Sequence, residues 1–226
     1  MNNKQLRNSL MLIKWYYKFL YLGLFLDHTV RQHNISWLAK DVDVRTWPNT
    51  TFRLKKDTIQ ELLEEIHSNP DKENIFGYFT QLTMFRGISA TMKELLDEEN
   101  KFKKFLSNNL WKNFFGFEQI IKFVRNTLSH NIDTNIILKK QDFENQKQYL
   151  LKYQRHIVKF NFTYAKVFPK YRKWNKNYWV NIKINFKNIS YWDKFFDIIT
   201  LHNLFLLSEL CYNMVEIYKA ENNLNI

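Results

Sequence analysis

The chain has 226 residues, of which 45% are hydrophobic, and it contains only 4 Gly and 3 Pro. This length and composition suit one sizeable core and exclude a disordered chain, while the shortage of turn residues argues against a β-sandwich or barrel and favours helices. The single cysteine excludes an intrachain disulfide and a cysteine-rich zinc site. The net charge of +12 predicts a polyanionic partner, either nucleic acid or an acidic membrane.

The first predicted element is a helix near the amino terminus. Its apolar residues recur at helical spacing, at Leu6, Leu10, Ile13, Tyr17 and Leu24. Residues 10–26 resemble a signal-peptide core, but Lys14 and Lys18 interrupt the stretch and no small-residue cleavage pattern follows it. Because the stretch is also too short and too charged to span a bilayer, we expect a packed helix and a cytoplasmic protein.

Further helices are expected before residue 132, over residues 57–67, 72–97, 100–110 and 117–131. Asp57 predicts a capped start for the helix over 57–67, and Pro70 lies beyond its end. Gly116 is expected to break the chain before the helix over 117–131. The buried stripe of that helix is predicted to consist of Phe117, Ile120, Ile121, Val124 and Leu128.

The basic excess is concentrated at the amino end and in residues 145–192, and the latter hold 11 Lys and Arg residues and no Asp or Glu. Within this segment apolar and polar residues alternate over 158–164 and again over 180–187, which is the period of β-strands. We therefore expect a β-hairpin insertion over 156–188. A long closing helix over 192–221 is predicted to follow it.

The expected tip of this hairpin, residues 165–178, mixes cations with aromatic rings. Bases stack on aromatic rings and phosphates pair with cations, so this mixture suits single-stranded nucleic acid, although about half of the aromatic residues in 145–192 are expected in the core. The residues predicted to bind RNA are Lys166, Lys170, Arg172, Lys173, Trp174 and Lys176.

The motif most informative about chemistry is Arg125-Asn126-x-x-x-His130, within the helix predicted over 117–131. RNA carries its own nucleophile, the 2′-hydroxyl. Metal-free cleavage then needs a group that exchanges protons near neutrality and a cation for the charge that develops at phosphorus. Histidine suits the first role, and arginine, which is permanently charged and fork-shaped, suits the second.

This motif resembles the Arg-x4–6-His signature of the HEPN superfamily (higher eukaryotes and prokaryotes nucleotide-binding). The resemblance implies a mainly α fold, a HEPN-like helical bundle with the β-hairpin inserted before its last helix, as a single domain over 1–226. It implies a metal-independent RNA endonuclease that leaves a cyclic phosphate end and uses no cofactor. His130 would be the catalytic base or acid, Arg125 would clamp the phosphate, and Asn126 would orient either of them.

The resemblance also implies partners. Arg125 and His130 are about 140° apart around a helix, and HEPN proteins commonly complete such sites by pairing the motif helices of two copies. We therefore expect a homodimer. Many relatives in the superfamily are toxins or antiviral abortive-infection effectors, and many pair with a nucleotidyltransferase antitoxin.

Other interpretations stay open. A non-catalytic nucleic-acid-binding helical protein that uses residues 145–192 would show the same charge pattern. A metal nuclease is disfavoured because its Pro-Asp…Glu-x-Lys letters fall on a predicted helix and its start. Ser129 or Thr127 as a nucleophile is disfavoured because the sequence shows no buried His–Asp partner for it. A peripheral membrane protein is the least favoured interpretation, because residues 145–192 alternate like a packed hairpin.

Overall fold

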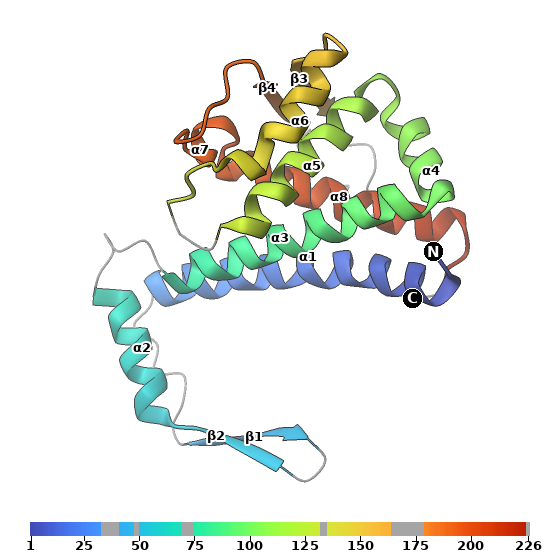
Figure 1. The fold of residues 1–226 in the computed structure, drawn as a ribbon. Helices are drawn as coiled ribbons and strands as arrows, with labels where there is room; N and C mark the ends of the chain where they lie inside the picture. Colours follow the sequence, from blue (N-terminus) through green and yellow to red (C-terminus); the bar gives the residue numbers. More distant parts are fainter. Residues whose placement is uncertain (33–40, 48–49, 69–74, 132–134, 164–178, 225–226) are drawn as a thin grey trace. The chain divides into compact units, whose positions relative to one another are not determined.

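The computed structural model describes residues 1–32, 41–47, 50–68, 75–131, 135–163 and 179–224 (Figure 1). The described chain is mainly helical, as predicted, with two small antiparallel sheets of two strands each. It forms two compact units, one of residues 1–20 with 82–226 and one of residues 21–81. The motif residues Arg125, Asn126 and His130 belong to the larger unit.

The elements follow one another in this order: α1 (Asn3–Gln32), β1 (Val42–Trp47), β2 (Thr50–Leu54), α2 (Lys56–Ser68), α3 (Ile75–Glu98), α4 (Asn100–Leu110), the 3-10 helix η1 (Trp111–Asn113), α5 (Phe114–His130), α6 (Lys140–Lys152), β3 (Ile157–Thr163), β4 (Trp179–Asn185), α7 (Phe195–Ile198) and α8 (Leu201–Glu221). The helices expected over 57–67, 72–97 and 100–110 are confirmed as α2, α3 and α4. The β1–β2 hairpin and α6 were not expected from the sequence.

Gly116 lies inside α5 rather than before it, so the prediction that it breaks the chain is wrong. The residue is buried, and a Cβ atom added to it would lie 1.9 Å from the carbonyl oxygen of Lys159. The missing side chain therefore lets the backbone of β3 approach α5 closely. Gly116 serves helix–strand packing here, and a helix tolerates it because that packing offsets its low propensity.

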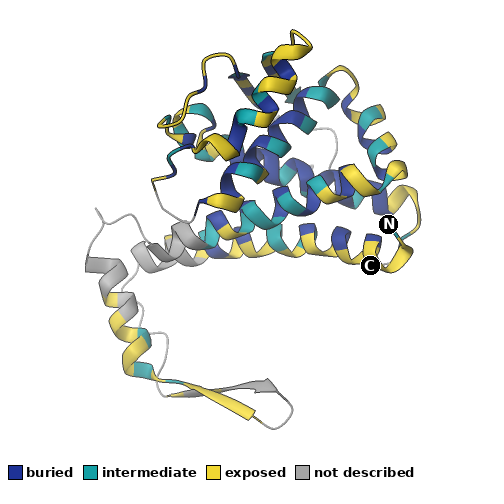
Figure 2. Ribbon diagram, in the orientation of Figure 1, coloured by how far each residue is buried: buried dark blue, intermediate teal, exposed yellow. Residues whose placement is uncertain are grey.

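The second hairpin matches the predicted alternation. β3 and β4 pair antiparallel, with Phe160 opposite Ile182. Alternate side chains face the core: Val158 and Phe160 in β3, and Val180, Ile182 and Ile184 in β4. α5 packs against β3, and α8 packs against β4. The Phe117 ring of α5 lies 5.6 Å from that of Phe160, so the hairpin shares one core with the helices (Figure 2). The expected tip, residues 165–178, lies outside the described residues.

The closing helix begins later than expected. Residues 192–221 were predicted as one helix, but the short α7 and then α8 occupy this range. Thr200 is the N-cap of α8: its hydroxyl accepts a hydrogen bond from the backbone N–H of Asn203 at 3.2 Å. A threonine that satisfies a free N–H group in this way favours a helix start at that point.

Candidate active site

The buried face of α5 determines which side chains of the motif reach the surface. All five residues of the predicted stripe are buried, Phe117, Ile120, Ile121, Val124 and Leu128, which confirms that prediction. Arg125 lies off this stripe and is exposed, and the side chain of His130, the last residue of the helix, is 37% exposed. Both motif side chains therefore lie at the surface.

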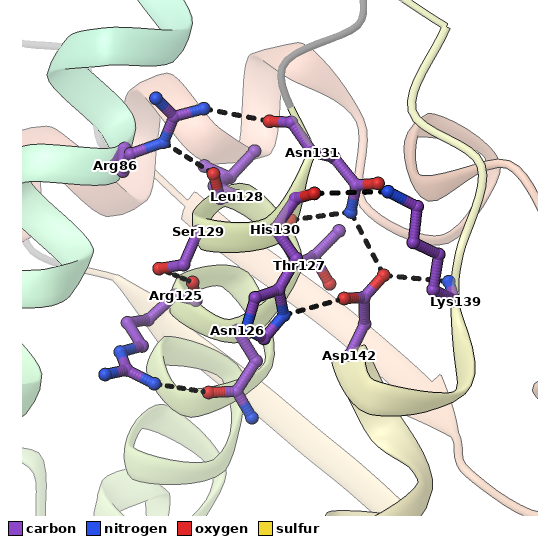
Figure 3. A network of polar contacts seen from close by, with 10 residues as sticks. All are labelled: Arg86, Arg125, Asn126, Thr127, Leu128, Ser129, His130, Asn131, Lys139 and Asp142. Carbon is purple, nitrogen blue, oxygen red and sulfur yellow. Dashed lines mark hydrogen bonds and ion pairs between the residues drawn. The ribbon is translucent and has the colours of Figure 1, made fainter.

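A carboxylate that the sequence did not point to lies against His130. Asp142, in the first turn of α6, is fully buried, and its Oδ1 atom is 3.0 Å from Nδ1 of His130 (Figure 3). Its Oδ2 atom accepts hydrogen bonds from the side-chain amide of Asn131 at 3.0 Å and from the backbone N–H of Lys139 at 2.8 Å. Each bond donated to this carboxylate holds it in place beside Nδ1 of the imidazole ring.

These contacts favour one tautomer of His130. A carboxylate only accepts hydrogen bonds when it is ionised, so the ring nitrogen that faces Asp142 is the one expected to carry the proton. Nε2 of the neutral ring is then left to accept a proton from a substrate. A histidine oriented by a carboxylate, with its second nitrogen directed away, is an arrangement that general acid–base catalysis commonly uses.

Arg125 and Asn126 lie one turn before His130. The Nη1 atom of Arg125 donates to Oδ1 of Asn126 at 3.1 Å (Figure 3). Asn126 and His130 are four residues apart and therefore share a face of α5. The Arg125 guanidinium thus reaches toward the face that carries His130, although the two residues leave the helix at different angles.

Two cations, one from α3 and one from the residue before α6, hold the carboxyl end of α5. Arg86 of α3 donates from Nε to the carbonyl oxygen of Leu128 and from Nη2 to that of Asn131, the latter at 2.8 Å. Nζ of Lys139 donates to the carbonyl oxygen of His130 at 3.2 Å. Positive groups at the free carbonyls of a helix end are favourable, and they fix the turn that carries His130.

The sequence indicated no His–Asp pair, and the structure has one between the exposed His130 and the buried Asp142. The sequence did not point to Asp142 because no helix was predicted over residues 140–152. A usable signal was present: Asp142 stands three residues after Lys139, at the place where an acidic side chain accepts the N–H of the residue before a helix. The hydroxyls of Ser129 and Thr127 gain no nucleophilic role from the pair: Ser129 donates to the carbonyl oxygen of Arg125 at 2.7 Å, and Thr127 is buried.

The residues predicted to bind RNA at the hairpin tip, Lys166, Lys170, Arg172, Lys173, Trp174 and Lys176, all lie outside the described residues. Across the part of the chain that the structure describes, no three His, Cys, Asp or Glu side chains gather as a metal site would need. In the same part, no helix is both long enough and apolar enough to cross a membrane.

Comparison of the chain with models of protein families, with curated proteins and with solved structures gives no match. The interpretation of the site therefore depends on the motif and on its geometry.

Proposed function

We propose that this chain is a metal-independent RNA endonuclease of the HEPN type, with His130 as the proton-transfer group and Arg125 as the phosphate clamp. The observation that carries the proposal is the pair of His130 with the buried Asp142, at a surface that also presents Arg125. A histidine that merely ended a helix would need no buried carboxylate. The pair gives His130 a fixed ring orientation, which a proton-transfer group needs.

The reaction follows from the residues present. Nε2 of His130 takes the proton of a ribose 2′-hydroxyl, whose oxygen then bonds to the adjacent phosphorus. The bond from phosphorus to the 5′ oxygen breaks, which leaves a 2′,3′-cyclic phosphate and a 5′-hydroxyl once that oxygen is protonated. Arg125 stabilises the negative charge on the phosphate oxygens during this exchange, and Asn126 holds the guanidinium.

A second copy of the chain fits this chemistry. The nucleophile and the leaving oxygen lie on opposite sides of the phosphorus in an in-line attack, so one imidazole serves both poorly. We therefore include a homodimer in the proposal, in which the motif helices α5 of two copies face each other and the second His130 protonates the leaving oxygen. Mixing the active parent chain with inactive His130→Ala chains should then lower the activity by more than dilution does, because a mixed dimer keeps only one of the two imidazoles, whereas a fully active monomer contradicts the shared site.

The test is cleavage of a mixed panel of RNA oligonucleotides by the purified chain in the presence of EDTA. His130→Ala should lower the cleavage rate by about 10²- to 10⁴-fold, the usual contribution of a proton-transfer group. His202→Ala, which removes an exposed histidine of α8, is the matched control and should leave the rate unchanged. Arg125→Ala should also be inactive. Arg7→Ala removes the same charge from an exposed position of α1 and should keep the activity of the parent chain.

Three results would overturn the proposal. Activity that EDTA abolishes and magnesium restores would show metal-dependent chemistry. Cleavage of DNA with the same sequence would show that the 2′-hydroxyl is not the nucleophile. Tight RNA binding without any cleavage would favour the alternative, a non-catalytic nucleic-acid-binding protein that uses residues 145–192.

The HEPN resemblance extends the proposal to a biological role as a toxin or abortive-infection effector, held inactive by a nucleotidyltransferase antitoxin. Expression of the chain in bacteria should then arrest growth, and His130→Ala should relieve the arrest. Equal toxicity of the two forms would contradict this role without bearing on cleavage by the purified protein.

A further inference from the structure

Trp192 occupies a backbone conformation that tryptophan rarely adopts. It is the third residue of the turn formed by residues 190–193, with φ of 87°, and it is 72% exposed. A positive φ at this place in a turn is usually given to Gly or Asn, because a bulky side chain is strained there. Strain of this kind persists where the surrounding structure imposes it, and it is found preferentially at functional sites.

The bonds that hold this turn do not involve the indole ring. The backbone N–H of Asp193 donates to the carbonyl oxygen of Ser190 at 3.4 Å, and the Asp193 carboxylate accepts from N and Oγ of Ser190 at 2.9 and 3.1 Å. The backbone N–H of Trp192 donates to the carbonyl oxygen of Leu138 at 3.2 Å. The backbone N–H of Leu138 donates to the carbonyl oxygen of Asp193 at 2.9 Å. A glycine at position 192 could keep every one of these bonds.

The turn is attached to the segment that builds the candidate active site. Leu138 precedes Lys139, whose backbone N–H binds Asp142 and whose ammonium group binds the carbonyl oxygen of His130. Next along the chain, the ammonium group of Lys140 lies 5.5 Å from the ring centre of Tyr191. The rings of Tyr191 and Trp192 are themselves 5.7 Å apart, and both are exposed.

We propose that Tyr191 and Trp192 form a binding site for an unpaired nucleobase of the RNA strand that is cut at His130. The choice of RNA as the ligand of this site rests on the proposed function. Any base offers a flat face that stacks on an indole ring, so such a site holds single strands with little preference for sequence. Lys140 is exposed, lies over the Tyr191 ring and supplies a cation for a flanking phosphate. The strained backbone then serves to present the indole at the surface.

The test measures RNA affinity and thermal stability on the same variants, in a His130→Ala background that does not cut the probe. The probes are fluorescent 20-nucleotide single strands of uridine or adenosine and DNA strands of the same sequences. Trp192→Gly should weaken RNA binding by about 5- to 150-fold, the range for loss of one stacked base. The same variant should melt about 2–4 °C higher, because the strain is relieved.

Trp111→Gly is the matched control. Trp111 is also an exposed tryptophan with a positive φ, 46°, and is 78% exposed. It precedes α5, at the opposite end of that helix from His130, roughly 25 Å away at 1.5 Å per residue. Its replacement should relieve strain in the same way and leave the RNA affinity unchanged. Trp192→Phe retains a ring and should keep most of the affinity.

Several results would overturn the site. One is an unchanged RNA affinity of Trp192→Gly, and another is a lower melting temperature of that variant that accounts for its loss of affinity. An equal loss of affinity in Trp111→Gly, or a parent chain that binds none of the strands, would also contradict the site. The test is separate from that of catalysis. A chain that binds RNA through Trp192 but cuts none would contradict only the proposed function, whereas cleavage with normal binding by Trp192→Gly would contradict only this site.

Discussion

The two β-hairpins of this chain differ in their relation to a core. In β3–β4, buried residues alternate with exposed ones along both strands, and the inward side chains of Val158, Phe160 and Ile182 are covered by helices. In β2 of the first hairpin, by contrast, residues 50–53 are exposed, and Phe52 shows 60% of its surface to solvent. The β1–β2 hairpin belongs to the smaller unit, and the β3–β4 hairpin belongs to the larger one.

The first hairpin is held by a surface ion pair. Asp43 and Arg53 face each other across the strands, and the guanidinium donates to both carboxylate oxygens, at 2.9 and 3.1 Å. The sequence of the first hairpin also alternates, with Val42 and Val44 beside Asp43 in β1 and Phe52 and Leu54 on either side of Arg53 in β2. The comparison teaches that alternation in a sequence indicates a strand, whereas burial of its apolar face depends on helices that pack against it, as they do on β3–β4.

The largest expected contrast comes from truncating one phenylalanine in each hairpin. Phe160→Ala removes a fully buried ring and should lower the free energy of unfolding by about 3–5 kcal/mol. Phe52→Ala removes a mostly exposed ring and should change it by less than about 0.5 kcal/mol. Chemical denaturation of the two variants beside the parent chain gives both values.

Cys211 offers a second measurement of this contrast. The thiol is fully buried in α8 and burial raises its pKa, so a thiol reagent should modify it only when the larger unit opens. Phe160→Ala should then speed the labelling by at least about 100-fold, since each 1.4 kcal/mol is tenfold. Equal labelling rates in Phe160→Ala and Phe52→Ala would mean that the second hairpin does not share the core of α8.

Sequence patterns predicted the elements that pack on the core through one regular face. The stripe of α5 and the alternation of β3–β4 repeat with the period of their structures, so burial could be assigned before the structure was known. The sequence did not predict α6, because many of its residues are polar or charged. Even its buried residues include the polar Asp142 and Gln146. Its helix is fixed by polar contacts made in three dimensions, which a one-dimensional period does not record.

The candidate site divides along the same line. Arg125, Asn126 and His130 lie within six residues of one another, so a local motif could be recognised in them. Asp142 is twelve residues beyond His130, and it meets the imidazole only because the chain turns back after α5. Arg86, which holds the end of α5, is still farther away in sequence. Contacts across such separations follow from the fold, which local spacing does not encode.

The next contrast concerns how closely β3 lies against α5. Gly116→Ala would place a methyl group 1.9 Å from a backbone oxygen of β3, and backbone can yield only if the hairpin moves. We expect a net loss of about 1–3 kcal/mol, despite the gain of about 1 kcal/mol that alanine brings to a helix. Hydrogen exchange of the β3–β4 amides should also become faster.

Gly87→Ala is the control for that substitution. Its added methyl group would meet the ring of Tyr16 at 2.6 Å, and a side chain can turn aside where a backbone cannot. The net change in the free energy of unfolding should therefore be smaller than for Gly116→Ala, and the exchange of the β3–β4 amides should be unaffected. A larger loss in Gly87→Ala would show that the second hairpin has room to move away from α5.

The smallest expected effect is that of the ion pair on the first hairpin. The hydrogen bonds from Arg53 lower the pKa of Asp43 from its ordinary value, so the pair stabilises the hairpin at neutral pH and loses this effect as the pH falls through the lowered pKa. Arg53→Gln should return the pKa of Asp43 toward its ordinary value in an NMR titration and speed the exchange of the β1–β2 amides at neutral pH. Below the pKa of Asp43 the variant and the parent should exchange alike, because the carboxylate is neutral in both.

Since both side chains are exposed, added salt should weaken the difference between the variant and the parent, and the melting temperature of the larger unit should not change. A fall in that melting temperature comparable to the one caused by Phe160→Ala would mean that the first hairpin, too, depends on the common core, and the contrast between the two hairpins would fail.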